Sequence, residues 1–327
     1  MRQFVYHLEK EKQFSACSKV LSEPKKHEAL IEFLFCGICG GDYSHYLGLR
    51  GKFPASLGHE FIARVLKTGE QVTEVQVGDL VVSDLNYRCN SCVFCKRQQT
   101  HLCIDNNIES FSNRGFATQA LIDSSYLVVA NDLKNILHGT LIEPLSCVIH
   151  AVSQINLNKN DDILIYGVGN IGTITAFYLT CILDLNNVYV YDHVAEKQKR
   201  VESLFRCRHY EDTHRYDVII EATNSLSGII SALAHAKYAR EICSISHLYG
   251  IDSSEIYEFL VKHEIKIKFP LRNGNKSTLQ KAARLISEVW NTSYDCIFEV
   301  ETIECINELF SKKHSSGFNK QVLSIGC

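Results

Sequence analysis

The sequence has almost no excess of charge of either sign. Its 34 Lys and Arg residues against 37 Asp and Glu residues leave a formal net charge of -3, so it lacks the basic surplus with which proteins bind nucleic acid. Residues 1–12 lack an apolar stretch behind a basic cap, and we therefore expect no secretory signal and a cytoplasmic protein. Internal repeats and low-complexity linkers are missing as well. What remains is the composition of an ordinary globular enzyme, with 46% hydrophobic and 22% charged residues.

One uncharged run is long enough to span a bilayer. It covers residues 163–183, and about 20 consecutive apolar residues suffice for a transmembrane helix. Glycines interrupt it at Gly167, Gly169 and Gly172, and no other run of the chain is comparable. We therefore interpret it as a buried strand, a glycine turn and a buried helix, and we expect no membrane contact.

Fourteen cysteines are present, and four of them are closely spaced. Without an export signal, they should be reduced thiols or metal ligands rather than disulfides. The closely spaced four, the cysteine quartet, are Cys89, Cys92, Cys95 and Cys103. Two-residue spacers let thiolates converge on one ion, and a fourth thiolate completes a tetrahedral shell without a position for substrate, which predicts a structural zinc site. An iron–sulfur cluster and chance clustering are the alternatives.

Other candidate ligands are scattered along the chain. Cys39 lies in a glycine-rich segment, His59 and Glu60 are adjacent, and Glu143 follows far downstream. A thiolate, an imidazole and a carboxylate leave one position on zinc open for water or an alcohol. Zinc promotes loss of the proton from a bound alcohol, whose alkoxide then releases hydride, and it polarises a carbonyl in the reverse direction. The alternative is that these residues share no metal, because buried cysteines are often small core hydrophobes.

A glycine turn follows the strand-like residues 163–166. It has the pattern G-x-G-x-x-G, and an apolar helical stretch comes after it, so we expect it to bind the pyrophosphate of a dinucleotide at the helix N-terminus. Asp192 ends the next apolar run, where a carboxylate would bind the ribose hydroxyls of NAD and repel the 2′-phosphate of NADP. The alternative for Asp192 is a solvated turn residue. The turn residues predicted to bind the cofactor are Gly167, Gly169, Asn170, Ile171 and Gly172.

The length of 327 residues suggests about two domains. The first 150 residues contain short apolar runs bounded by glycines and predict irregular β structure. From residue 162 onward, β-rich runs alternate with helical patterns, which predicts a parallel sheet covered on both faces and hence an α/β fold. We expect strands over residues 163–166, 188–191, 218–221, 242–245 and 265–269, and a helix over residues 277–290 that Ser277 caps.

Taken together, the motifs resemble those of zinc-containing medium-chain dehydrogenases, most closely the sorbitol dehydrogenase-like branch. The matching segments are residues 37–40, 58–60 and 77–79, the cysteine quartet, residues 142–146 and the glycine turn. The resemblance implies a GroES-like, mostly β catalytic domain at residues 1–150, completed by about residues 285–327. It also implies a Rossmann coenzyme domain with a doubly wound parallel sheet at residues 151–284, and an active-site cleft between the two domains.

The same resemblance assigns roles to the scattered ligands. Cys39 and His59 look like ligands of a catalytic zinc. Glu60 is similar to the neighbouring carboxylate that binds zinc directly or through water, and Glu143 to the glutamate that the polyol branch has beside the zinc. The cofactors are then two zinc ions per chain and NAD, and the protein is expected to form a homodimer or homotetramer.

The proton relay departs from the family pattern. The family usually has Ser or Thr at position 41 and often His at position 44, whereas this chain has Gly41 and Ser44, followed by His45. The alcohol proton then has three routes: a water beside Gly41, a carboxylate of Glu60 or Glu143, or a displaced relay of Ser44 and His45. We favour the route through a carboxylate and water, because His45 is out of register by one residue.

We therefore predict an NAD-dependent zinc dehydrogenase whose substrate is a secondary alcohol, a polyol, a sugar or a polyol phosphate. Arg272 lies near the position at which related enzymes have a substrate-contacting arginine. One alternative is a non-catalytic member that binds NAD and zinc as a sensor or structural subunit, which only Gly41 favours. Another is a zinc-free quinone-type reductase with NADPH, against which the cysteine quartet, Cys39 and Asp192 argue.

Overall fold

The chain folds into two compact units. The computed structural model describes residues 2–105, 115–246, 260–312 and 317–326. The first unit comprises Met1–Ser146, Arg272–Ser316 and Lys320–Cys327, and the second comprises Cys147–Leu271 and Gly317–Asn319. The chain thus returns to the first unit at residue 272, whereas the sequence places this boundary near residue 284. The reason is that helix α8 (Lys276–Val289) packs against strand β8 (Leu127–Val129) of the first unit.

A largely antiparallel sheet forms the frame of the first unit. Its strands follow the order β15-β16-β3-β5-β6-β8, and β7 pairs with the beginning of β3. They are β3 (Glu28–Gly37), β5 (Glu60–Thr68), β6 (Leu80–Ser83), β7 (Gln119–Asp123), β8, β15 (Phe298–Thr302) and β16 (Lys320–Ser324). A smaller sheet contains β1 (Arg2–Lys10), β2 (Gln13–Val20) and β4 (Ala55–Ser56). The short helices are α1 (Gly40–Tyr46), α2 (Val93–Lys96) and α9 (Ile306–Ser311), and α3 (Ile142–Val152) leads out of the unit.

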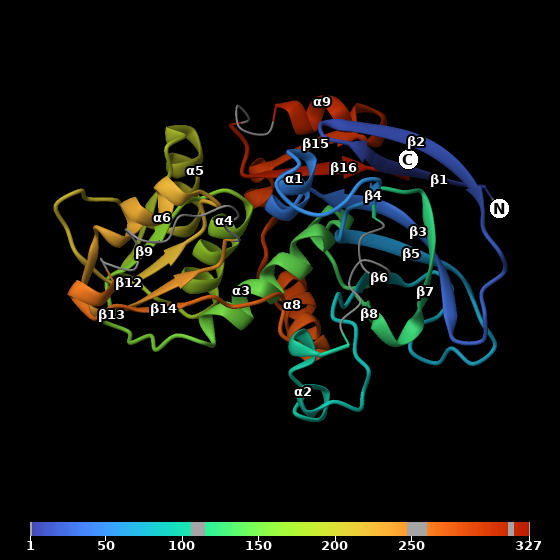
Figure 1. Ribbon diagram of the computed structural model, residues 1–327, viewed down its shortest axis with the longest axis horizontal. Coiled ribbons are helices and arrows are strands. Elements are labelled where there is room, and N and C mark those ends of the chain that lie inside the picture. Colours follow the sequence, from blue (N-terminus) through green and yellow to red (C-terminus); the bar gives the residue numbers. More distant parts are fainter. Residues whose placement is uncertain (1, 106–114, 247–259, 313–316, 327) are drawn as a thin grey trace. The chain divides into compact units, whose positions relative to one another are not determined.

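The C-terminal chain completes this sheet. β16 lies between β15 and β3 (Figure 1), parallel to β15 and antiparallel to β3. The register sets Val322 opposite Gly37, and Gly37 opposite Glu60 on β5. Residues from the two ends of the sequence therefore meet at the carboxyl end of β3, where the candidate metal ligands lie.

Aromatic rings fill the core of the first unit. Phe14, Phe116 and Phe310 have ring centroids 4.8 to 6.1 Å apart, and all three side chains are buried. Phe310 belongs to α9, so burial of these rings binds the returning chain to the N-terminal strands. Full burial of one aromatic side chain stabilises a fold by roughly 1.5–3 kcal/mol.

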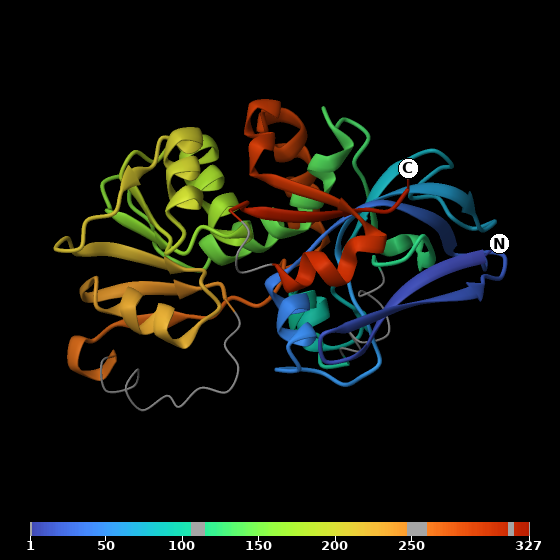
Figure 2. The same cartoon turned by 90° about the horizontal axis from the view of Figure 1, so that it is seen from above.

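The second unit contains a parallel sheet in the order β11-β10-β9-β12-β13-β14. Its strands are β9 (Ile163–Tyr166), β10 (Val188–Tyr191), β11 (Arg208–His209), β12 (Tyr216–Glu221), β13 (Ala236–Ser244) and β14 (Lys266–Lys268). The bounds of β9 and β10 are those predicted, the other three predicted strands overlap β12, β13 and β14, and β11 was not predicted. Figure 2 shows α4 (Asn170–Phe177) and α5 (Ala195–Phe205) on one face and α6 (Leu226–Leu233) on the other. This doubly wound arrangement confirms the predicted α/β class, and ligands of such sheets bind where the strand order reverses, here between β9 and β12.

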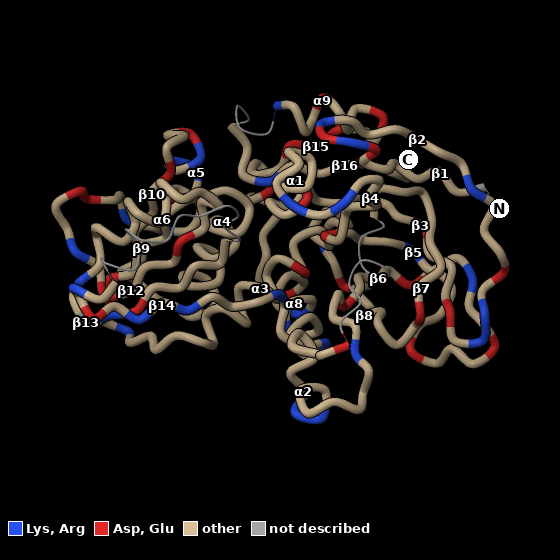
Figure 3. The backbone as a smooth tube through the Cα atoms, in the orientation of Figure 1, with Lys and Arg blue, Asp and Glu red and all other residues tan. Residues whose placement is uncertain are grey.

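The long uncharged run folds as predicted. Residues 163–183 form β9, the glycine turn, α4 and a short π-helical segment (Tyr178–Ile182). Within the described ranges of the chain, no helix is long and apolar enough to cross a membrane. Lys and Arg are interspersed with Asp and Glu along both units (Figure 3), which agrees with the small net charge.

The predicted cap of α8 is wrong. The helix begins at Lys276, and its N-cap is Asn275 rather than Ser277. Asn275 has an extended backbone, and its side-chain oxygen accepts a hydrogen bond from Thr278 N at 3.1 Å. Ser277 instead donates its hydroxyl to the same oxygen at 2.7 Å. Asn and Ser are equally good caps, so the choice between them depends on the chain direction that enters the helix.

Candidate functional site

Three predicted ligands converge at the end of β3. Suitable ligand atoms of Cys39, His59 and Glu60 all lie within 4.8 Å of one another. Cys39 is the N-cap of α1, and Glu60 begins β5 directly after His59. Two motifs that are separate in the sequence, at Cys39 and at His59-Glu60, are therefore close together in space. We call these three residues the metal cluster.

A backbone amide and a carboxylate hold Cys39 in place. Gly41 N donates to Cys39 Sγ at 3.4 Å, and Cys39 N donates to Asp42 Oδ2 at 3.1 Å. The two contacts form a capping box at the start of α1. These contacts fix the position of the sulfur, which is the atom that would bind a metal.

Asp42 is a site residue that sequence reasoning missed. Its carboxylate is buried, lies 3.6 Å from His59 Nδ1 and accepts a hydrogen bond from Gly58 N at 3.4 Å. A carboxylate behind a metal-binding imidazole fixes the tautomer and orientation of the ring. Its position three residues after Cys39, together with the capping box that this spacing allows, is the signal that could have identified it.

The electrostatic field of the metal cluster suits a cation. Burial lowers the pKa of His59, yet nearby negative charges outweigh burial and raise this pKa well above its ordinary value. These charges belong, in order of decreasing effect, to Asp42, Cys39 and Glu143. Groups that retain a proton on an imidazole will also favour a divalent metal in its place. A sulfur, a nitrogen and a carboxylate oxygen are moreover the donor set of catalytic zinc sites, so the residues present fit zinc.

A second missed residue, Lys320, neutralises Glu60. Lys320 Nζ forms an ion pair with the Glu60 carboxylate, and both side chains are almost completely buried. Gly37 allows this approach, because a Cβ at that position would collide with Lys320 Nζ and come within 2.8 Å of Glu60 Oε2. Lys320 and Glu60 are 260 positions apart in the sequence, so no local pattern could indicate the pair.

The other predicted active-site residues lie outside the metal cluster. Glu143 is buried in the first turn of α3 and acts on the pKa of His59 through its charge. Ser44 is buried and donates its hydroxyl to Gly40 O at 3.1 Å. The ring of His45 packs so closely on Gly51 that a Cβ there would overlap it. The hydroxyl of the predicted displaced relay is thus bonded within its own loop, and the imidazole is packed against that loop.

The cysteine quartet forms a compact sulfur site. Its four sulfurs lie within 4.8 Å of one another, and Cys89 Sγ is 4.0 Å from Cys95 Sγ. Sulfurs bound tetrahedrally to zinc are about 3.8 Å apart, as a Zn–S bond of about 2.3 Å requires. Backbone amides of Cys92 and Cys95 point at sulfurs at 3.3 and 3.4 Å. Hydrogen bonds from Ser91 are the main cause that lowers the pKa of Cys89 to about 6, whereas burial raises the pKa of Cys95 to about 12. The close spacing of the four sulfurs is what fits a structural zinc.

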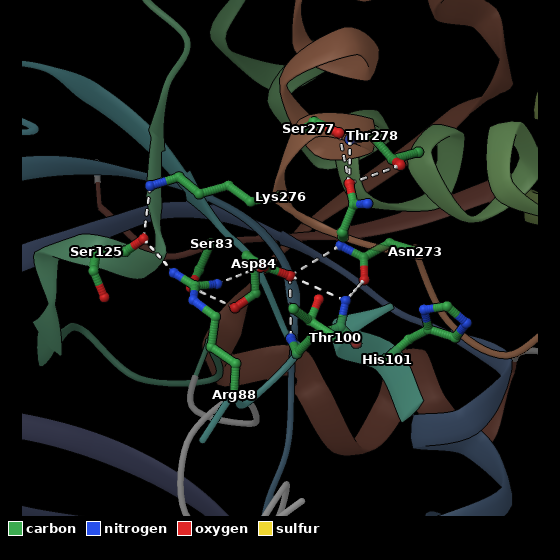
Figure 4. A network of polar contacts seen from close by, with 12 residues as sticks. Ser83, Asp84, Arg88, Thr100, His101, Ser125, Asn273, Lys276, Ser277 and Thr278 are labelled. Carbon is green, nitrogen blue, oxygen red and sulfur yellow. Dashed lines mark hydrogen bonds and ion pairs between the residues drawn. The ribbon is translucent and has the colours of Figure 1, made fainter. Parts of the chain in front are cut away.

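The quartet lies in a small lobe, residues 87–103. A buried polar network connects this lobe to the segment before α8 (Figure 4). Asp84 and Asn86 are fully buried, and Asn86 Nδ2 donates both to Asp84 Oδ1 at 3.1 Å and to the side chain of Asn273. Arg88 donates to Asp84 Oδ2 at 2.9 Å. His101 Nδ1 contacts Gly274 O at 2.8 Å. The lobe, poor in apolar residues, is therefore held by these polar contacts as well as by its thiolates.

The glycine turn has the geometry of a dinucleotide site. Gly167 has a positive φ of 97°, and a Cβ on Gly172 would collide with the carbonyl of Gly167, whereas a Cβ on Gly169 would meet nothing within 4 Å. The open space at Gly169 is what the approach of a pyrophosphate needs. Asp192 accepts hydrogen bonds from Val168 N and Val194 N, both at 2.8 Å. Its carboxylate therefore shapes the turn, and its remaining lone pairs are those predicted to accept from a ribose.

A second group of residues holds the turn from its other side. Asn319 donates its amide to Val168 O at 2.7 Å, and Arg200 donates to Asn319 Oδ1 at 2.9 Å. Asn319 is buried in the second unit. Both carbonyl and amide of Val168 thus have fixed partners, an arrangement that the sequence did not reveal.

Comparisons with known proteins agree with this geometry. Residues 25–132 match the alcohol dehydrogenase GroES-like domain. D-arabinitol dehydrogenase 1 of Uromyces fabae is 29% identical over 66% of this chain and 67% of its own length. The sorbitol dehydrogenase of Halalkalibacterium halodurans is 32% identical over 50% of this chain, so the match spans about half of that relative, 48%.

Solved structures show the same fold over nearly the whole chain. L-idonate 5-dehydrogenase from Escherichia coli superposes with a TM-score of 0.84 at 19% identity, covering 99% of this chain and 98% of that one. A putative zinc-binding dehydrogenase from Sinorhizobium meliloti bound to NADP superposes with a TM-score of 0.82 at 21% identity, covering 99% of both chains. The predicted combination of a GroES-like and a Rossmann unit is therefore confirmed. The chain is thus similar to zinc-dependent medium-chain dehydrogenases, and among them to polyol dehydrogenases.

Proposed function

We propose that this protein is a zinc-dependent oxidoreductase that transfers a hydride between NAD and a secondary alcohol, a polyol, a sugar or a polyol phosphate. The observation that carries the proposal is the metal cluster, in which a thiol, an imidazole and a carboxylate lie within 4.8 Å of one another. Relatives named D-arabinitol dehydrogenase, sorbitol dehydrogenase and D-arabitol-phosphate dehydrogenase support the substrate class.

The residues of the metal cluster take separate roles. Cys39 and His59 would hold the zinc, and the Asp42 carboxylate, 3.6 Å from His59 Nδ1, would orient the imidazole from behind. The bound metal supplies Lewis acidity, which promotes ionisation of an alcohol and polarises a carbonyl in the reverse reaction. Glu60 is neutralised by Lys320, which leaves Glu143 as the carboxylate that takes up the hydroxyl proton through water.

The second unit supplies the coenzyme site of the proposal. The pyrophosphate of NAD would rest on the open backbone at Gly169, at the N-terminus of α4. Asp192, buried beside the turn, would select NAD over NADP. We also propose a homodimer or homotetramer, which light scattering on the purified protein tests directly.

One experiment separates this function from its rival, a non-catalytic NAD- and zinc-binding subunit that Gly41 favours. Purified protein with NAD is given a panel of polyols, polyol phosphates and sugar acids, and nicotinamide absorbance is followed together with zinc content. Cys39→Ser should abolish turnover and remove one zinc equivalent, whereas Cys17→Ser, a cysteine of β2 outside both sulfur sites, should change neither. A protein that holds two zinc ions and binds NAD but oxidises nothing in the panel would support the rival.

A further inference from the structure

Arg50 lies beside the position where residue 41 has no side chain. A Cβ on Gly41 would stand 3.2 Å from Arg50 Nη1 and 3.8 Å from Cys39 Sγ. A guanidinium nitrogen and the sulfur of the metal cluster are thus both within 4 Å of one point. Residue 41 thus offers no hydroxyl, and a cation lies next to it.

The loop that carries Arg50 is folded back onto α1. Gly48 N donates to His45 O at 2.9 Å, and Leu49 N donates to Ser44 O at 3.0 Å. Gly48 and Gly51, on either side of Arg50, have positive φ values of 72° and 75°, a conformation that glycine adopts without cost. These turns direct the segment toward the first turn of the helix, so the position of Arg50 follows from the local fold.

The charge at this position is permanent. A guanidinium stays protonated at every pH at which proteins are folded, and its planar fork matches phosphate and carboxylate groups in a bidentate manner. It cannot replace a relay hydroxyl, because it has no acceptor lone pair and does not release its proton. A neutral polyol can only accept hydrogen bonds from such a group, whereas an anion is attracted by its charge as well.

We propose that Arg50 is a specificity-determining residue that binds an anionic group of the substrate near the carbinol that reacts. The substrate class is then a polyol or sugar that carries a phosphate ester or a carboxylate. This inference rests on the proposed function. The competing explanation is that Arg50 only balances the negative charges of Asp42 and Glu143 around the metal cluster.

The kinetic test compares substrates that differ in one group. A neutral polyol, its phosphate ester and the corresponding sugar acid are assayed with wild type, Arg50→Gln and Arg50→Lys. Arg50→Gln should lower the anionic-to-neutral ratio of kcat/KM by about 10- to 100-fold, the usual value of a charge-assisted hydrogen bond, and Arg50→Lys should lower it less. Lys52→Gln, which removes an exposed charge of the same loop, should leave the ratio unchanged. Comparison of kcat/KM for the phosphate ester and for the sugar acid shows which anionic group the site prefers.

A binding measurement gives a readout that does not depend on turnover. Inorganic phosphate is titrated into zinc-loaded protein at saturating NAD, so that the pyrophosphate site is filled. Wild type should bind phosphate. Arg50→Gln should raise the dissociation constant for phosphate by about the same 10- to 100-fold, with the zinc content unchanged. Gly41→Ser, whose side chain would press on Arg50 Nη1, should weaken phosphate binding while the charge is retained.

The outcomes separate the possibilities. Equal losses on neutral and anionic substrates, or loss of zinc from Arg50→Gln, would show that Arg50 balances charge and would overturn the inference. If wild type oxidises no alcohol, the proposed function fails, and the phosphate titration still decides whether Arg50 binds anions. If Arg50→Gln does not fold, Arg50→Lys and Gly41→Ser test the same inference.

Discussion

Lys320 and Glu60, residues from opposite ends of the chain, form a buried ion pair beside the metal cluster. The pair exists because β16 enters the sheet next to β3, and because Gly37 leaves room between them. A buried pair of this kind contributes little net stability over apolar residues, but removal of one partner leaves an uncompensated charge. Its arrangement therefore couples the C-terminal strand to the metal site.

Removal of the lysine should therefore be costly. Lys320→Met should lower the free energy of unfolding by roughly 3–5 kcal/mol, measured by urea denaturation of the metal-loaded protein. Lys19→Met, at an exposed position of β2, is the matched control. The double variant Lys320→Met/Glu60→Gln should recover much of the loss, because no buried charge remains. If Lys320→Met unfolds at the same urea concentration as the control, Glu60 has another partner in solution.

The cysteine quartet should hold one of two zinc ions. Cys92→Ser should lose one equivalent by elemental analysis and should unfold more easily, since the free energy of binding structural zinc is part of the folding free energy. Cys296→Ser, at an exposed cysteine, should keep both ions and the stability. Iron in the purified protein, or two equivalents in Cys92→Ser, would contradict the assignment of the quartet to zinc.

The sequence predicted those features whose signals are local. The bounds of β9 and β10 follow from short apolar runs, and the cysteine quartet follows from its spacing alone. The glycine turn follows from its local pattern, because Gly167 has a positive φ and a Cβ on Gly172 would collide with the carbonyl of Gly167. Features of this kind need no knowledge of the rest of the fold.

The partners of the metal cluster could not be predicted in the same way. Lys320 reaches Glu60 through the register of three strands, and Asn319 reaches Val168 across 151 positions of the sequence. Arg50 lies near the candidate ligands only because its loop turns back onto α1. Contacts between distant segments are set by packing, which no periodicity or spacing in the chain encodes.

Asp42 should strengthen zinc binding through His59. Asp42→Asn removes the negative charge that raises the pKa of the imidazole most, and loss of such an outer partner costs about 10- to 100-fold in metal affinity. Competition with a coloured chelator measures the effect on the more weakly held zinc. Asp132→Asn, on an exposed loop, should leave the affinity unchanged. An equal affinity in Asp42→Asn would mean that His59 is not a ligand.

Asp192 should determine the choice of coenzyme. Asp192→Ser removes the charge that would repel a 2′-phosphate and also frees Val168 N and Val194 N. We therefore expect the preference for NADH over NADPH to fall by about 10- to 100-fold, and both to bind somewhat less tightly because the turn is less ordered. Fluorescence titration with each coenzyme measures this, with Asp184→Ser, at an exposed position, as control. Equal binding of both coenzymes by wild type would contradict the role of Asp192.

The proton of the alcohol should leave through Glu143. Ser44 Oγ already donates to Gly40 O, and the His45 ring is packed against Gly51, whereas the charge of the buried Glu143 acts on His59. Glu143→Gln removes the proton acceptor but keeps the shape, and it should slow turnover by roughly 100-fold or more. His45→Ala should slow it only slightly.

The pH–rate profile at saturating NAD distinguishes the two routes. Wild type and His45→Ala should show the same rise of kcat with pH, because the carboxylate must be ionised to accept the proton. Glu143→Gln should lose this rise while its zinc content stays at the wild-type value. A profile that flattens in His45→Ala but persists in Glu143→Gln would mean that the proton leaves through His45. A loss of zinc in Glu143→Gln would instead show that this glutamate is a ligand of the metal. Glu143 would then take the coordination position that Glu60 does not fill, because Glu60 is paired with Lys320.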